Sequence, residues 1–249
     1  MSKKSKSRVA QDNNRKLART KFWLLLFPVA ALLIKFIVMA NSEAGGWLGA
    51  DGENYLTGVD GLLKDGFFST EGKLIYWPAG YPLFIWPFAK ISLTNFIYFI
   101  SFFQSVLFAW ATYIFARAIS QTKVNQAATW SSFIISFNPT LSLSSLAIGY
   151  ESPIASLLMI AISFILRDIA ASKTILSTRN VVISGLCLSV STFFQPRIIL
   201  FAIVLIAVWM ISKEKTVVRI KISAAMLILT MLFPSALILR NVVANEQAA

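Results

Sequence analysis

Long apolar runs separated by short polar loops dominate this chain. The first run, 22–40, contains a single charged residue, Lys35, and further runs follow to about residue 240. About 20 consecutive apolar residues are needed for a helix to cross the hydrocarbon core of a bilayer. Only 14% of the residues are charged, against about a quarter in soluble domains. The sequence therefore predicts an all-α fold, a polytopic transmembrane helical bundle.

The apolar runs predict about seven spans. We place them near 22–40, 83–118, 127–143, 153–167, 181–195, 198–212 and 222–240. The 83–118 stretch is longer than one crossing needs. Trp86, Pro87 and Lys90 are therefore expected at the membrane interface, before a span that begins near Thr94.

Basic residues gather at one end of the expected spans. Eight lie in segment 1–21, and most of the others fall in alternate loops, as Arg117, Lys123, Arg167, Lys173, Arg179, Lys213, Lys215, Arg219 and Lys221. Cytoplasmic loops carry this excess of Lys and Arg. We therefore expect a cell-membrane, multi-pass protein with a cytoplasmic N-terminus and an external 41–82 loop. The net charge of +12 then reflects topology, so no nucleic-acid partner is expected.

The domain boundaries follow from the same pattern. Segment 1–21 has too few apolar residues to form a core and is expected to be a disordered cytoplasmic tail. Residues 22–240 form the predicted transmembrane domain, and 241–249 a short tail.

Two residue types are too scarce for several kinds of site. The chain has no histidine and one cysteine, Cys187. This excludes a Ser-His-Asp triad, an internal disulfide and multi-cysteine or histidine-based metal sites. Acid–base chemistry must come from Asp, Glu, Lys or Tyr. No nucleotide-binding glycine motif is present.

The 41–82 loop is the one long polar segment between spans. It holds six of the eleven acidic residues, Glu43, Asp51, Glu53, Asp60, Asp65 and Glu71. Long loops of this kind are often functional. Within it, Leu56, Val59, Leu62 and Leu63 recur at helical spacing, which predicts a short helix on the membrane surface.

Asp51 and Lys35 are the first candidate functional residues. Asp51 follows the first span by about ten residues, and a carboxylate just outside the membrane can deprotonate an acceptor hydroxyl or amine. The alternative is a helix N-cap. Lys35 lies toward the outer end of the first span, where it either snorkels to the interface or holds an anionic headgroup.

Three further elements carry polar or aromatic residues at expected outer boundaries. Segment 76–84, YWPAGYPLF, is rich in proline and aromatic residues and predicts a rigid turn or an aromatic anchor. Tyr150-Glu151 places a carboxylate at a helix end, where it must be wet, paired or functional. Arg197, after Gln195-Pro196, suits a phosphate; the alternatives are snorkelling or an ion pair with Glu151 or Asp51.

Taken in order, these elements resemble the GT-C superfamily of membrane glycosyltransferases. The likeness is closest to the branch of protein mannosyltransferases and the aminoarabinose transferase of lipid A. Asp51, Tyr55 and Trp77-Pro78-Ala79-Gly80-Tyr81-Pro82 match the family's external loop, and Tyr150-Glu151 and Arg197 match later positions. Pro196 precedes the arginine here, whereas proline follows it in the family. The resemblance covers roughly 22–212.

The resemblance implies transfer of a sugar from a polyprenyl-phosphate donor to an acceptor glycan, lipid or protein outside the membrane. Asp51 would activate the acceptor, and Arg197 and Lys35 would hold the donor phosphate. Glu151, Tyr55 and Tyr81 would line the substrate site. The resemblance implies no certain cofactor and allows a divalent metal, which Glu151 would help to bind.

Relatives usually contain more spans and often a soluble C-terminal domain, whereas this sequence ends after about seven. Two other readings therefore stay open. One is a non-catalytic or half-enzyme subunit that pairs with a second membrane subunit. The other is a transporter or flippase component, which predicts ionisable residues at mid-span, and few are present.

Overall fold

The fold is helical almost throughout. The computed structural model describes residues 3–42, 47–48, 51–75, 79–124, 126–171, 176–210 and 215–248 of the 249-residue chain. Apart from one pair of two-residue strands, all regular structure within these ranges is helix. The predicted all-α class is therefore confirmed.

The N-terminal helix α1 (Lys3–Ala40) is longer than the sequence predicts. Residues 3–21, expected to be disordered, continue the helix of the first apolar run. Our expectation relied on the lack of apolar residues, but this segment is rich in Lys and Arg and has no Gly or Pro. Such residues favour helix on propensity alone.

Two helices occupy the long polar loop. α2 (Gly52–Asp65) confirms the helix expected from Leu56, Val59, Leu62 and Leu63. α3 (Gly80–Ile91) covers the second half of the segment that we expected to be a turn. Pro82 lies in its first turn, where a missing N–H costs no helical hydrogen bond. Residues 76–78 lie outside the described residues.

Gly80 lets α3 approach its neighbour closely. A Cβ atom at this position would lie 2.0 Å from the carbonyl oxygen of Phe193. The absence of a side chain therefore brings the start of α3 into direct backbone contact with the next-to-last residue of α8.

The remaining elements follow the expected spans closely. They are α4 (Phe96–Ser120), α5 (Ala127–Phe137), α6 (Pro139–Leu143), α7 (Glu151–Ala170), α8 (Thr178–Phe194), the 3₁₀ helix η1 (Pro196–Ile198), α9 (Ile199–Met210) and α10 (Thr216–Ala248). α10 runs through most of the expected tail 241–249, because residues 241–248 contain no helix breaker.

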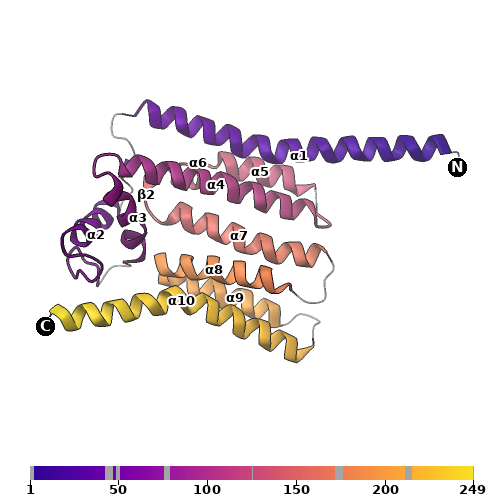
Figure 1. Cartoon of the computed structure of the whole chain (residues 1–249). Coiled ribbons are helices and arrows are strands. Elements are labelled where there is room, and N and C mark those ends of the chain that lie inside the picture. Colours follow the sequence, from indigo (N-terminus) through magenta and orange to yellow (C-terminus); the bar gives the residue numbers. More distant parts are fainter. Residues whose placement is uncertain are drawn as a thin grey trace.

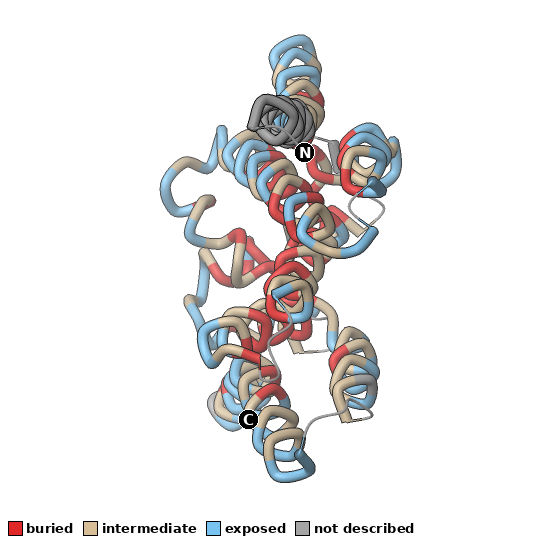
Figure 2. Tube along the Cα trace, turned by 90° about the vertical axis from the view of Figure 1, so that its right-hand side faces the viewer, coloured by how far each residue is buried: buried red, intermediate tan, exposed pale blue. Residues whose placement is uncertain are grey.

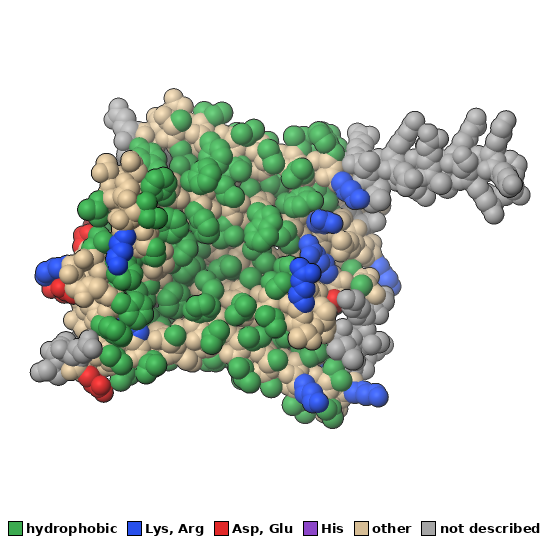
Figure 3. Space-filling model, viewed as in Figure 1, with side chains coloured by type: hydrophobic (Ala, Val, Ile, Leu, Met, Phe, Trp, Pro, Cys, Tyr) green, Lys and Arg blue, Asp and Glu red, His purple; other side chains and the backbone are tan. Residues whose placement is uncertain are grey.

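The long helices lie side by side and define two ends of the molecule. In Figure 1, α1, α4, α5, α7, α8, α9 and α10 run between one end, which carries α2 and α3, and the opposite end, which carries the N-terminus. We call these the loop end and the basic end. Lys and Arg side chains cluster at the basic end in Figure 3, and the band between the ends is largely apolar.

Four of these helices are long and apolar enough to cross a membrane. They are Lys21–Ala40, Phe96–Ser120, Glu151–Ala170 and Thr216–Glu246. Ala127–Phe137, Thr178–Phe194 and Pro196–Ala207 are apolar but shorter. The expectation of a membrane protein is thus supported, and the number of crossings stays a prediction.

Burial is distributed as in a membrane protein. Many large apolar side chains are exposed on the outer surfaces of the helices, whereas serines and threonines are buried between them. Figure 2 shows the buried positions where neighbouring helices face one another. Ser132 on α5, for example, donates to the Leu24 carbonyl of α1 at 3.1 Å. Small polar residues of this kind allow close helix packing in lipid.

Candidate functional site

A short parallel strand pair joins the 41–82 loop to the bundle at the loop end. β1 (Trp47–Leu48) pairs with β2 (Ala147–Ile148), with Leu48 opposite Ile148. Because the strands are parallel, the two segments that follow them leave the pair in the same direction. Asp51 and Glu151 each follow their paired residue by three positions, and each stands at the start of a helix. The pairing therefore brings the two candidate carboxylates to the same end of the bundle.

Asp51 occupies the N-cap position of α2 without capping it. Its side chain makes no capping hydrogen bond to the helix. Only its backbone carbonyl takes part, accepting from the Tyr55 N–H at 3.2 Å. The residue is half-buried. The alternative reading of Asp51 as a side-chain N-cap is therefore not realised, and its carboxylate is left for another role.

Glu151 is exposed at the first residue of α7. Its carboxylate lies over Gly149: a Cβ atom there would be 2.3 Å from Oε2. Glycine at this position is what allows the carboxylate to approach the turn between β2 and α7.

Tyr81 lies directly beneath this turn. It is 0% exposed; its hydroxyl accepts from the Gly149 N–H at 3.0 Å and donates to Gln104 Oε1 at 3.2 Å. Burial raises the pKa of the Tyr81 phenol, and the charge of nearby Glu151 raises it further. The hydroxyl therefore stays protonated and fixes the geometry of the turn that carries Glu151.

A layer of aromatic rings, which we call the aromatic floor, lies between the loop helices and the bundle. Tyr55 packs edge-on against Tyr81, with ring centroids 4.9 Å apart, and against Tyr150 at 5.9 Å. Tyr81 packs in the same way against Phe194 at the end of α8. Gln195 Nε2 donates to the Tyr150 hydroxyl at 2.7 Å. The structure therefore brings the predicted residues Tyr55, Tyr81 and Glu151 together.

Arg197 lies at the same end, in η1. It is exposed, and its neighbour Ile198 packs against the hydrophobic cluster that contains Tyr55 and Tyr81. Among the described residues, the expected ion pair with Glu151 or Asp51 is not formed within 4.0 Å. The guanidinium is thus available to an anion outside the bundle.

Lys35 lies away from this group of residues, inside the bundle. It is 2% exposed; Nζ donates to Ser145 Oγ at 2.9 Å and lies 4.5 Å from the centroid of the Phe108 ring. The Lys35 side chain therefore does not snorkel to the interface. The sequence placed Lys35 near the outer end of a span, but could not reveal that Ser145, 110 residues later, would be its partner.

The polar contacts of Lys35 continue along α4 to Tyr81. Ser105 Oγ lies 3.1 Å from Ser145 Oγ, Ser101 Oγ donates to the Leu146 carbonyl, and Gln104 Nε2 donates to the Ala147 carbonyl. These α4 side chains satisfy the irregular backbone between α6 and α7, as buried backbone in a bilayer requires. Sequence reasoning missed Gln104, although an amide within a strongly apolar helix was a usable signal.

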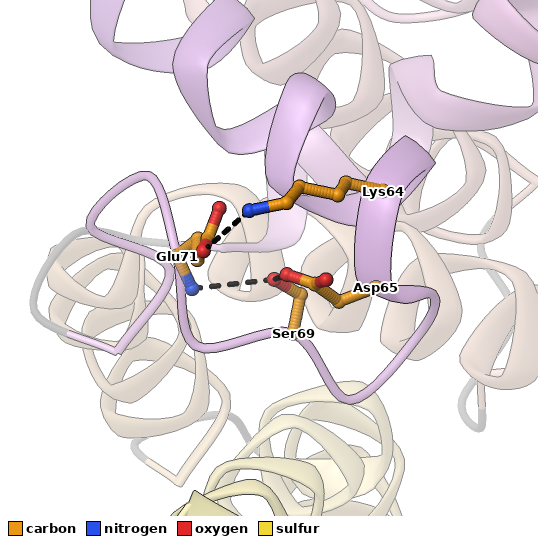
Figure 4. A network of polar contacts seen from close by, with 4 residues as sticks. All are labelled: Lys64, Asp65, Ser69 and Glu71. Carbon is orange, nitrogen blue, oxygen red and sulfur yellow. Dashed lines mark hydrogen bonds and ion pairs between the residues drawn. The ribbon is translucent and has the colours of Figure 1, made fainter.

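The rest of the 41–82 loop is held by its own polar contacts (Figure 4). Lys64 Nζ and Glu71 Oε1 are 2.9 Å apart, Ser69 Oγ donates to Asp65 Oδ2, and the Glu71 N–H donates to Ser69 Oγ. Two of the loop's acidic residues therefore have structural partners.

Arg240 of α10 connects this loop to the bundle. It is 3% exposed and donates to the backbone carbonyls of Phe67 and Ser69. Nothing in the sequence pattern pointed to this contact, because its partners are backbone atoms more than 170 residues away.

An apolar groove of about 490 Å³ opens beside the aromatic floor, between α3, α8 and α10. We call it the aromatic groove. Its walls are formed by Phe67, Leu83, Phe84, Trp86, Pro87, Val190, Phe193, Phe194, Phe233, Ala236, Leu237 and Arg240. Phe84 and Phe194 belong to both the groove and the floor. The groove suits a hydrocarbon chain whose polar end lies near the candidate residues.

No ready-made metal centre is found in the part of the chain that the structure describes. It contains no group of three Asp, Glu, His or Cys side chains able to hold an ion.

Comparisons with known proteins identify no relative. No protein-family model, no curated protein and no solved structure matches this chain. The site is therefore interpreted from its residues and their geometry.

Proposed function

We propose that this chain is an inverting membrane glycosyltransferase that uses a polyprenyl-phosphate-linked sugar. The observation that carries the proposal is that strand pairing brings Asp51 and Glu151 to the loop end, where the tyrosine-lined floor and the aromatic groove also lie. A group-transfer site for a lipid-linked donor needs a base, anion-binding and polar residues, and an apolar path for the lipid. These features lie together here.

The residues suit the following reaction. The Asp51 carboxylate accepts the proton of the acceptor hydroxyl or amine as that atom attacks the anomeric carbon of the sugar. The bond between this carbon and the phosphate oxygen breaks, and its electron pair stays on the phosphate. Polyprenyl phosphate leaves, and the anomeric configuration is inverted.

The other residues bind and position the substrates. Arg197, exposed and without an ion-pair partner in the described chain, stabilises the charge that develops on the leaving phosphate. Glu151 binds sugar hydroxyls or a divalent cation where one is used. Tyr81 holds the turn that presents Glu151. The buried contacts of Lys35 favour a positioning role over direct binding of the donor phosphate.

We further propose that the chain crosses the membrane seven times, with the loop end outside. The three shorter apolar helices supply the additional crossings, and α5 is extended toward the loop end by α6. Clustering of Lys and Arg at the other end (Figure 3) supports this orientation.

The test compares the wild-type chain with Asp51→Asn in nanodiscs. Each is incubated with a panel of radiolabelled polyprenyl-phosphate sugars and a membrane extract as acceptor source. Asn keeps the size of Asp but cannot act as a base, so transfer should fall by about 10²–10⁴-fold. Asp60→Asn is the matched control, because Asp60 is exposed on the same helix and its loss should leave transfer unchanged.

Two outcomes would contradict the proposal. Equal transfer by wild type and a folded Asp51→Asn variant would remove Asp51 from the reaction. The lack of transfer by the wild type from every donor would favour a non-catalytic subunit, and co-purification of a second membrane protein would then be tested.

A further inference from the structure

A second cavity, of about 250 Å³, lies between α7, α9 and α10. Its walls are formed by Ile165, Ile169, Leu176, Leu205, Ile206, Trp209, Ile222, Ser223 and Met226. Apart from Leu176, which lies between α7 and α8, these residues belong to the last turns of α7 and α9 and the first turns of α10. The cavity therefore lies at the basic end, opposite the candidate active site (Figure 1).

Two wall residues have polar atoms that are buried and unsatisfied. Trp209 Nε1 and Ser223 Oγ have no hydrogen-bond partner among the described residues. The indole N–H can only donate, and the hydroxyl can donate as well. The other wall side chains are aliphatic or Met, and they offer no oxygen acceptor. Leaving such donors unpaired costs about 1–3 kcal/mol each, which favours a ligand that carries an oxygen acceptor.

A cationic side chain stands next to this cavity. Arg219 lies one turn before Ser223 on α10, and its guanidinium donates to the carbonyl of Met210, the residue after Trp209. A second bond, 3.0 Å long, reaches Thr216 Oγ1. These contacts hold the guanidinium between the ends of α9 and α10.

We propose that this cavity binds one anionic phospholipid from the leaflet at the basic end. An acyl chain fills the apolar cavity, an ester carbonyl accepts from Trp209 Nε1 and Ser223 Oγ, and the phosphate lies beside Arg219. A phospholipid combines these three features in the required order. The site is separate from the proposed glycosyltransferase site, and the inference does not depend on it.

The test is a binding titration of the delipidated, full-length chain by native mass spectrometry. Phosphatidylglycerol and phosphatidylcholine with identical acyl chains are the two probes. The wild type should bind one phosphatidylglycerol about tenfold more tightly than phosphatidylcholine, a difference expected for one favourable charged contact. Glycerol phosphate, which has no acyl chain, should not compete.

Two variants separate the carbonyl contacts from the phosphate contact. Trp209→Phe/Ser223→Ala keeps the apolar wall but removes both donors, and affinity for both lipids should fall about tenfold. Arg219→Gln should remove the preference for phosphatidylglycerol. Trp130→Phe is the matched control, because Trp130 is exposed outside the cavity, and lipid binding should not change.

Several results would overturn the inference. These are equal binding of the two lipids by the wild type, unchanged binding by a folded Trp209→Phe/Ser223→Ala variant, or competition by glycerol phosphate alone. Thermal unfolding of each variant establishes that it is folded. If Arg219→Gln does not fold, the lipid preference of the wild type and the effect of Trp209→Phe/Ser223→Ala decide the question.

Discussion

At the residue scale, the candidate site depends on buried hydrogen bonds that reach between distant helices. Tyr81 connects the loop helix α3 to Gln104 on α4 and to the Gly149 backbone. Lys35 connects α1 to Ser145 at the other end of the same network. A buried polar group that loses its partner costs more than the bond itself contributes. Single substitutions in this network should therefore lower the free energy of unfolding by a measurable amount.

Tyr81→Phe should lower stability and change its dependence on pH. Removal of the hydroxyl leaves the Gly149 N–H and Gln104 Oε1 without this partner, which we expect to cost about 1–3 kcal/mol at about pH 8. Burial raises the pKa of Tyr81 in the folded chain, whereas in the unfolded chain it ionises near its ordinary value of about 10. Above that pH the unfolded state binds fewer protons, so the wild type loses stability as pH rises.

The phenylalanine variant should therefore lose less stability than the wild type between about pH 8 and about pH 11. Thermal unfolding in detergent across this range measures both effects. Tyr98→Phe, a half-buried position on α4, serves as the control. Parallel pH profiles for the wild type and Tyr81→Phe would show that the phenol is not buried as described.

Lys35 and Ser145 should be energetically coupled. A double-mutant cycle with Lys35→Met and Ser145→Ala should give a coupling free energy of about 0.5–2 kcal/mol, because each substitution removes the same 2.9 Å hydrogen bond. Lys35→Met with Ser132→Ala is the matched control, since Ser132 bonds the Leu24 carbonyl instead. A coupling of zero for Lys35 and Ser145 would mean that the two groups do not interact.

At the scale of elements, the 41–82 loop is positioned by helices far from it in sequence. α3 meets α8 where Gly80 permits backbone contact, and α10 reaches the 66–71 segment through Arg240. The loop thus depends on the C-terminal helix for its placement beside the aromatic groove.

Arg240→Ala should loosen the loop. The substitution leaves the Phe67 and Ser69 carbonyls without their guanidinium partner, so local opening becomes easier. Hydrogen exchange of segment 66–75 should be faster than in the wild type. Lys221→Ala, an exposed position on the same helix, should leave exchange unchanged, and equal exchange in both variants would contradict the role of Arg240.

The sequence was sufficient to predict most of the helices, but not the contacts between them. Apolar periodicity located α2 and the helices of the expected spans, because amphipathic and apolar patterns are local. The pairing of Leu48 with Ile148, and the bonds of Lys35, Gln104 and Arg240, depend on residues tens of positions apart or more. Spacing along the chain contains no information on such partners. The prediction of disorder for residues 3–21 was wrong because it considered only whether the segment could form a buried core, and not its helix propensity.

At the scale of the whole molecule, charge and apolar surface divide the chain into two ends and a band between them (Figure 3). Helices long enough to cross a membrane connect the ends. The candidate active site lies at one end, and the proposed lipid site lies at the other.

The two ends should face opposite sides of the membrane. In a Cys187→Ser background, Lys64→Cys marks the loop end and Lys215→Cys marks the basic end. A membrane-impermeant maleimide should label Lys64→Cys from outside intact cells and Lys215→Cys only after the membrane is opened, because Lys and Arg are retained on the cytoplasmic side. Labelling of both positions from the same side would contradict the proposed topology.

The central proposal is that this chain transfers sugar at its loop end. The most direct measurement uses proteoliposomes of purified protein, with the fraction of outward-facing loop ends known from labelling at Lys64→Cys. A radiolabelled polyprenyl-phosphate sugar and an acceptor are added outside only. The account predicts that transfer rises in proportion to the fraction of outward-facing loop ends and is lost with Asp51→Asn. Transfer that follows the inward-facing fraction, or no transfer with any donor, would contradict it.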